Sequence, residues 1–288
     1  MNLLVELGVQ GLINGAIYAL IATGLAMVFG LLRILHIAHA GLFALGGYLG
    51  LVITNASGSF ALGLAGAMLL VGVCGMAMYR LCYEPILDKP PYVALIASVG
   101  LFIAMEELFR LVFGAYGRSY RRVPLQGALE FAGMRIKYAE LGVAVLTVGL
   151  LVGLALFTSR TRVGIAWRAT VTDSRMAASF GVSIAGVRYL NFFIGSALAA
   201  AAGVMVGVLN NLVEPGMGGV PSYKALAIIV LGGLGNLNGT LVAALLLGLV
   251  EAYGSIYLSK VLDRDSIAFA ALIAVLLVRP QGLFGLRS

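Results

Sequence analysis

The sequence predicts an all-α fold, a polytopic bundle of about eight membrane-spanning helices, from two observations. Of its 288 residues, 61% are hydrophobic and only 11% are charged, whereas soluble domains carry about 25% charged residues. The mean hydropathy is +1.04, so the apolar excess extends along the chain. We therefore expect residues 1–288 to form a single transmembrane domain.

The expected spans are apolar runs of about 20 residues, the length that crosses a bilayer as a helix. No basic region precedes the first run, and Glu6 stands there instead, so we expect this run to be retained rather than cleaved. Two runs, 222–234 and 266–279, are short, which is typical of broken or re-entrant segments. The count is therefore eight, within a range of seven to nine. The longer runs are 8–32, 37–54, 60–79, 92–113, 139–157, 189–212 and 239–258.

Glycine is abundant, with 39 residues. In lipid, helices associate through close backbone approach, which glycine permits. We therefore expect tightly packed helices at five GxxxG motifs: Gly11–Gly15, Gly46–Gly50, Gly149–Gly153, Gly203–Gly207 and Gly235–Gly239.

Three polar connections interrupt the apolar runs, at 80–91, 114–138 and 158–188. Two spans separate the first from the third, so these two share a side and the 114–138 loop lies opposite. Lysine and arginine number seven in the first and third loops and five in the middle loop. This difference is too small to orient the chain by the positive-inside rule.

The net charge of +7 fits basic loops beside a membrane. Basic residues form no stripe with interleaved aromatics, so no nucleic-acid partner is expected. Cys74 and Cys82 are too few for a disulfide framework or a thiolate metal site.

The 158–188 loop contains an amphipathic segment, 164–182. Apolar or small residues recur there at helical spacing, and Gly181 stands where a helix commonly ends. We predict a short helix that either lies on lipid headgroups or docks on a partner. The stripe consists of Ile165, Ala169, Thr172, Met176 and Phe180.

The same segment resembles the cytoplasmic coupling loop of ATP-binding-cassette importer permeases. It is most similar to the H-type permease subunit of the branched-chain amino acid uptake family. The matching residues, which the resemblance assigns to coupling with the ATPase, are Gly164, Ala166, Arg168, Ala169, Asp173, Ala177 and Gly181.

Three further stretches carry the resemblance along nearly the whole chain. His36–His39, continuing through Gly46–Tyr48, is similar to the family segment after the first span. Leu231–Gly235 with Gly239 resembles its late glycine-rich turn, and Arg279–Gly285 resembles its C-terminal motif.

The resemblance implies a subunit that forms half of a translocation pathway and catalyses no reaction itself. It implies a second homologous permease, a heterodimer being the expected form, two cytoplasmic ATPase subunits and a periplasmic binding protein. The chain has no phosphate-binding loop motif, so ATP would be bound by partner subunits and no cofactor or metal by this chain. The implied location is a bacterial inner membrane, with the 158–188 loop and the C-terminus in the cytoplasm and the 114–138 loop outside.

Candidate pathway residues are Asn14, Tyr18, His36, His39, Gly41 and Glu251. The two histidines either sit as polar residues at a membrane interface, line the passage at a helix break, or ligate a metal or haem. His36, Ala40 and Gly41 depart from the family pattern, which leaves the substrate open among branched-chain and related small organic solutes.

Other charged or polar residues within the runs admit several roles. An ionisable group as deep in an apolar run as Glu251 suggests a functional role. Glu251 either forms an interhelical hydrogen bond or contacts the substrate. The residues expected to solvate it are Tyr253, Asn236 and Asn238. Glu106 and Arg110, four apart, suit an ion pair. Trp167 either packs on the ATPase or anchors the loop in headgroups.

Two other functions remain open at this stage. An ion-coupled secondary transporter would use Glu251 as its proton carrier. A membrane metal- or haem-binding redox protein would use His36 and His39.

Overall fold

The computed structural model describes residues 2–131, 134–258, 263–279 and 282–284. Within these ranges seven helices are long and apolar enough to cross a membrane, and Gly219–Gly232 is a shorter apolar helix. The expected helical bundle, with a span count between seven and nine, is confirmed.

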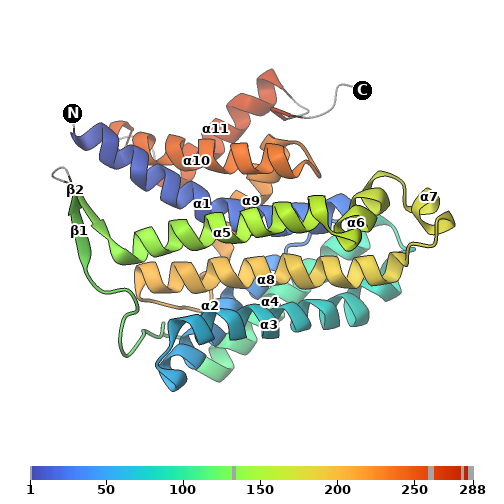
Figure 1. The fold of residues 1–288 in the computed structure, drawn as a ribbon, viewed down its shortest axis with the longest axis horizontal. Helices are drawn as coiled ribbons and strands as arrows, with labels where there is room; N and C mark the ends of the chain where they lie inside the picture. The colour runs from blue at the N-terminus through green and yellow to red at the C-terminus, as the bar shows by residue number, and fades with distance from the viewer. Residues whose placement is uncertain (1, 132–133, 259–262, 280–281, 285–288) are drawn as a thin grey trace.

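Figure 1 shows the bundle, whose long helices run roughly alongside one another. In chain order the elements are α1 (Asn2–Leu32), α2 (His39–Ser57), α3 (Phe60–Met78), the π-helical turn η1 (Tyr79–Tyr83), the 3-10 turn η2 (Glu84–Ile86), α4 (Pro91–Phe113), β1 (Ala128–Phe131), β2 (Met134–Lys137), α5 (Tyr138–Arg160), α6 (Arg162–Thr172), α7 (Ser174–Ser179), α8 (Ile184–Asn210), α9 (Gly219–Gly232), α10 (Leu237–Tyr257) and α11 (Arg264–Val278).

The 80–91 connection is shorter than predicted, because helical turns η1 and η2 continue α3 to Ile86. Pro91 then begins α4, since proline lacks an amide hydrogen and suits the first helical position. Arg80 and Glu84 both hydrogen-bond the hydroxyl of Tyr189 near the start of α8. The first and third loops therefore share one end of the bundle, as expected.

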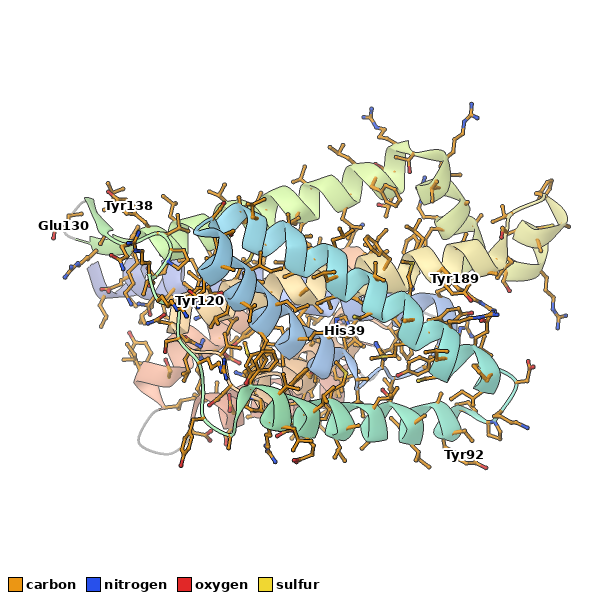
Figure 2. The ribbon with its side chains drawn as sticks, turned by 90° about the horizontal axis from the view of Figure 1, so that it is seen from below. His39, Tyr92, Tyr120, Glu130, Tyr138 and Tyr189 are labelled. Carbon is orange, nitrogen blue, oxygen red and sulfur yellow. The ribbon has the colours of Figure 1, made fainter. Side chains whose placement is uncertain are left out.

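The 114–138 connection contains an antiparallel hairpin of β1 and β2, in which Ala128 pairs with Lys137. This hairpin was not predicted. It lies at the end of the bundle opposite α6 and α7 (Figure 1). In Figure 2, Glu130 and Tyr138 mark the hairpin end, and Tyr189 lies toward the other.

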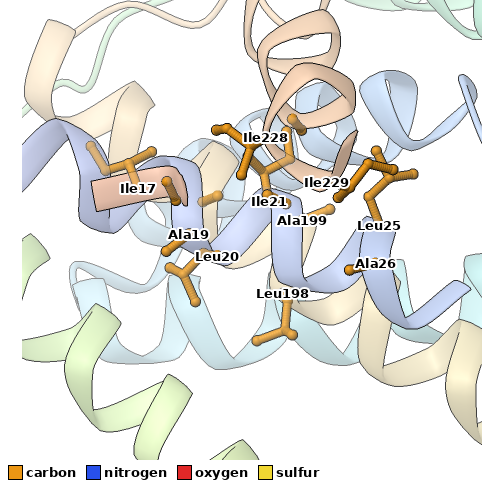
Figure 3. Packing of buried hydrophobic residues seen from close by; sticks show 14 of the residues in the cluster. Ile17, Ala19, Leu20, Ile21, Leu25, Ala26, Leu198, Ala199, Ile228 and Ile229 are labelled. Atoms are coloured by element: carbon orange, nitrogen blue, oxygen red, sulfur yellow. The ribbon is translucent and has the colours of Figure 1, made fainter. Parts of the chain in front are cut away.

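The core lies where α1 packs against α8, α9 and α10. Figure 3 shows Ile21 and Leu25 of α1 beside Ala199 of α8 and Ile228 and Ile229 of α9. All five side chains are almost completely buried. Few residues of α4 and α5 are buried by contrast, so these two helices offer their faces to lipid or to a partner chain.

Four of the five GxxxG motifs, those that begin at Gly11, Gly46, Gly203 and Gly235, lie at close approaches between helices. A Cβ added to Gly15 would lie 2.9 Å from the Cα of Leu245 in α10, and one added to Gly46 would meet the backbone of Ala200 in α8. No atom of the described residues lies within 4 Å of the corresponding positions at Gly149 and Gly153 in α5. The packing role expected for that third motif is therefore wrong within this chain.

Candidate functional site

The predicted amphipathic helix is two short helices, α6 and α7, separated by Asp173. The carboxylate of Asp173 accepts hydrogen bonds from the backbone amides of Arg175 and Met176, both at 2.9 Å. It therefore caps the start of α7, a role that satisfies amides left free at a helix N-terminus. Gly181, with φ of +82°, follows α7.

The apolar stripe of this loop points away from the rest of the chain. Ile165 is 51% exposed, Met176 is 57% exposed and Phe180 is 81% exposed. Arg168 and Ala169 are exposed beside them. Large apolar side chains exposed at one end of a membrane protein indicate a surface that a partner or lipid covers.

The small residues of the loop serve the fold as well as the surface. A Cβ added to Gly164 would lie 2.5 Å from the Cα of Thr158, so glycine lets α6 turn back closely on α5. Ala177 is buried and Ala166 is half-buried.

Trp167 has neither of the two roles expected for it. Its side chain is buried, and its indole N–H donates to Asn191 Oδ1 of α8 at 2.8 Å. The amide of Asn191 in turn donates to the carbonyl of Met27 in α1 at 3.1 Å. Trp167 thus ties the loop to two helices of the core.

A hollow of about 800 Å³ lies beside α6. On one side it is lined by Trp167 and Arg168 of α6, and on the other by the turn that joins α9 to α10. The C-terminal motif packs on this turn, because the amide of Leu283 donates to the carbonyl of Leu231 at 2.6 Å. Two stretches that carried the family resemblance therefore form one structure.

A cluster of charges lies in the bundle around Glu251, whose side chain is fully buried. One carboxylate oxygen lies 2.8 Å from Lys224 Nζ of α9. The other lies 2.9 Å from Arg264 Nε of α11 and accepts a 2.8 Å hydrogen bond from the hydroxyl of Tyr18 in α1. Lys224 also pairs with Asp265 at 2.8 Å.

This charge cluster is balanced, with two cations, two carboxylates and one phenol. A charge removed from water needs such partners, because an isolated buried charge is strongly unfavourable. The cluster joins α1, α9, α10 and α11. Of the two roles left open for Glu251, the structure shows interhelical contacts.

The partners expected for Glu251 were wrong. Tyr253 donates to the carbonyl of Leu4, and the side chain of Asn236 accepts from the amide of Gly239 at the start of α10. Neither side chain contacts Glu251. Tyr253 lies on another face of α10, and Asn236 precedes the helix. Among the other pathway candidates on α1, Tyr18 joins the cluster and Asn14 is half-buried nearby along the helix.

Lys224, Arg264 and Asp265 were not predicted to belong to this cluster. Lys224 was a usable signal, since a lysine inside a short apolar run is costly unless paired. Arg264 and Asp265 stand in a polar connection, where charged residues ordinarily face water, so their pattern gave no sign of this role. Just before them, the pKa of Asp263 is lowered because the hydroxyl of Ser266 donates to its carboxylate.

His36 and His39 lie at the break between α1 and α2, and both are buried. Their ring centroids are 5.6 Å apart. His36 Nδ1 lies 2.7 Å from the hydroxyl of Tyr83, and His39 Nε2 donates to the carbonyl of Ile21 at 3.2 Å. Figure 2 places His39 within the bundle, so both rings face protein rather than solvent.

The remaining nitrogen of each histidine has no hydrogen-bond partner among the described residues. Those residues also contain no group of three or more His, Cys, Asp or Glu side chains placed to hold a metal ion. Gly41, the next candidate on α2, packs against Met105 of α4.

Farther along α4, the predicted ion pair is confirmed, with Arg110 Nη2 2.6 Å from Glu106 Oε1. Arg110 also pairs with Glu107 at 2.6 Å. Both pairs are partly exposed, so each is worth little to stability.

The long apolar helices packed into one bundle define a polytopic helical membrane protein. The chain belongs to the family described as "Branched-chain amino acid transport system / permease component", whose profile matches residues 8–278.

Individual relatives agree with this assignment. The chain is 31% identical to the high-affinity branched-chain amino acid transport system permease protein BraD of Pseudomonas aeruginosa, over 96% of this chain and 94% of BraD. It is 32% identical to LivH of Escherichia coli K12, with the same coverages. It is 25% identical to LivM of the same organism, over 93% of this chain and 67% of LivM.

A solved structure shares the fold. PsaBC from Streptococcus pneumoniae, in complex with Fab, superposes with a TM-score of 0.51 at 11% sequence identity, covering 93% of this chain and 89% of that one. The resemblance expected from the sequence motifs is confirmed, and the chain is a transport permease component.

Proposed function

We propose that the chain is one of two permease subunits of an ATP-driven importer for branched-chain or related aliphatic amino acids. Two ATPase subunits would bind on the side of α6 and α7, and a periplasmic binding protein would deliver the substrate on the hairpin side. The chain itself would catalyse no reaction and hold no cofactor. It would lie in a bacterial inner membrane with its C-terminus in the cytoplasm.

The observation that carries this proposal is the outward-facing stripe of Ile165, Met176 and Phe180 on α6 and α7. A loop in contact with water gains nothing by exposing three large apolar side chains together. An ATPase that covers them would gain the burial, at about 25 cal/mol per Å² of apolar surface. Arg168, exposed beside the stripe, would fix the register of docking through a charged contact.

The fold supplies a route from this surface into the bundle. Trp167 holds α6 to Asn191 of α8 at 2.8 Å, and Asn191 holds α8 to the carbonyl of Met27 in α1 at 3.1 Å. A displacement of α6 by the ATPase would therefore move α8 and α1 with it. Both helices belong to the core that separates the two ends of the molecule.

The relatives support a second permease subunit. LivH and LivM are both named as permease proteins of the high-affinity system, and this chain is similar to both. The higher identity to LivH supports a heterodimer, with a LivM-like chain as the second subunit. Among the described residues, the largely exposed helices α4 and α5 offer the area that such a partner needs.

The proton-coupled alternative has less support. Glu251 already contacts two cations, Lys224 and Arg264. To bind a proton, Glu251 would have to give up its ion pairs with Lys224 and Arg264. The buried ammonium group of Lys224 would then lose its pairing with Glu251, which is unfavourable.

The test is purification of the tagged chain from its native membranes in mild detergent, followed by mass spectrometry and an uptake assay. An ATPase and a second permease should co-purify, and uptake of leucine should require ATP. Arg168→Glu should reduce ATPase recovery and uptake, whereas Arg162→Glu, at the start of the same helix, serves as the matched control. Recovery of the chain without any ATPase, or ATP-independent uptake, would contradict the proposal.

A further inference from the structure

A second hollow lies beside the end of α6, where α1, α7 and α8 meet. Its volume is about 340 Å³. Three arginines line it: Arg33 directly after α1, Arg175 in α7 and Arg188 near the start of α8. We name it the arginine hollow, and it is distinct from the surface of Ile165, Met176 and Phe180 proposed for the ATPase.

The charge of the arginine hollow is not balanced by its own lining. Asp173 is the one carboxylate among the residues that line it. That carboxylate already accepts hydrogen bonds from two backbone amides of α7. The lining therefore carries an excess of two positive charges, unlike the balanced cluster around Glu251.

Part of the donor set of the hollow is left available. Arg188 hydrogen-bonds Tyr79 and lies near Glu84, but its Nε is buried and has no hydrogen-bond partner among the described residues. The side chains of Arg33 and Arg175 are exposed, and no acidic residue within the described ranges forms an ion pair with either of them. Guanidinium groups present several N–H donors in a plane that matches the oxygens of phosphate.

The position of the hollow favours a lipid as the source of the anion. Arg33 follows the last turn of α1 and Arg188 lies close to the beginning of α8, and both helices are long enough to span a membrane. The ends of such helices lie at the level of lipid headgroups. Gly30, Leu31 and Leu32 complete the wall beside Arg33, which gives the start of an acyl chain an apolar surface.

We propose that the arginine hollow is a binding site for the phosphate group of an anionic phospholipid. Basic pockets between membrane-spanning helices bind anionic headgroups in this way. A lipid held there would contact α1, α7 and α8 at once. It would hold the α6–α7 loop against the membrane surface, whether or not an ATPase is present, so the site does not depend on the proposed import function.

The experiment compares purified protein titrated with phosphatidylglycerol or with phosphatidylcholine, with bound lipid counted by native mass spectrometry and stability followed as Tm. The test variant is Arg33→Gln/Arg175→Gln, because both side chains are exposed and have no structural partner to lose. The matched control is Arg160→Gln/Arg162→Gln, which removes two exposed arginines from the same end outside the hollow.

The wild type and the control should bind phosphatidylglycerol in preference to phosphatidylcholine and melt at a higher temperature with it. The test variant should bind phosphatidylglycerol about tenfold or more weakly, since each arginine near a membrane surface contributes roughly a fivefold change in affinity. Arg175→Gln alone, which leaves the end of α1 unaltered, should show a loss of several-fold.

Three results would overturn the proposal. Equal losses in the test variant and the control would mean general attraction by surface charge. Equal stabilisation by inorganic phosphate would mean a site for a soluble anion. Unchanged lipid binding in the test variant, together with loss of a co-purifying ATPase, would assign the hollow to an acidic face of that protein.

Discussion

The ammonium group of Lys224 lies 2.8 Å from a carboxylate oxygen of Glu251, and the two side chains are 3% and 0% exposed. They come from different helices, α9 and α10. In an apolar environment neither charge is tolerable without the other, because desolvation is not recovered unless a partner is present. This pair therefore fixes how the short helix α9 sits against α10.

Glu251→Gln is expected to destabilise the protein by about 3–5 kcal/mol, because it leaves Lys224 and Arg264 without their shared carboxylate. Lys224→Met should cost a similar amount, and the double variant should cost less than the sum of the two. Thermal unfolding in detergent measures all three. Glu107→Gln, in a partly exposed pair with Arg110, is the control and should change stability by less than about 1 kcal/mol. Additive losses in the double variant would show that the two residues do not interact.

The sequence predicted the membrane-spanning helices well, because an apolar run of about 20 residues has few structures open to it other than a spanning helix. The run 92–113 corresponds to α4, at Pro91–Phe113, and the run 60–79 corresponds to α3 and its continuation. The predicted helix boundaries were least accurate at the 80–91 connection. Leu81, Cys82 and Tyr83 extended the helix there, whereas the prolines suggested a loop.

The functional positions were predicted less completely, because their roles depend on partners far away in sequence. Glu251 was singled out by its depth in an apolar run. Its contact with Tyr18 joins residues 233 positions apart, which no local pattern can reveal. Asp173, which the family resemblance assigns to coupling with the ATPase, also caps the start of α7, a role that was not predicted.

The helix crossings give a prediction with an internal control. Gly46→Ala should destabilise the protein by about 1–3 kcal/mol, since the added methyl group would meet the backbone of Ala200 and force α2 away from α8. Gly149→Ala meets no atom of the described residues within 4 Å and should be neutral or slightly stabilising. Tm in detergent distinguishes them. Equal Tm values for the two variants would contradict the packing assigned to α2 and α8.

The histidine pair at the break between α1 and α2 predicts a measurable coupling. His36 Nδ1 and the hydroxyl of Tyr83 are 2.7 Å apart and buried, so His36→Ala should cost about 1–3 kcal/mol by removing one of the hydrogen-bond partners of the phenol. Tyr83→Phe removes the hydroxyl and should make the later loss of His36 milder. A double-mutant cycle on unfolding free energies should give a coupling of about 0.5–3 kcal/mol. A coupling near zero would show that the contact contributes nothing.

Trp167 gives a prediction that separates docking from transmission. Trp167→Phe keeps most of the buried ring but removes the N–H that donates to Asn191 at 2.8 Å, so α6 loses its polar link to α8. The exposed stripe of Ile165, Met176 and Phe180 is unchanged, so an ATPase should still co-purify at the wild-type level. Uptake should fall while ATP hydrolysis continues, because movement of α6 no longer reaches α8.

Phe180→Ser is the complementary variant, since it alters the exposed surface and should reduce ATPase recovery itself. Loss of the ATPase in Trp167→Phe, together with its retention in Phe180→Ser, would contradict this assignment. The ATPase would then dock on the side of α6 that carries Trp167.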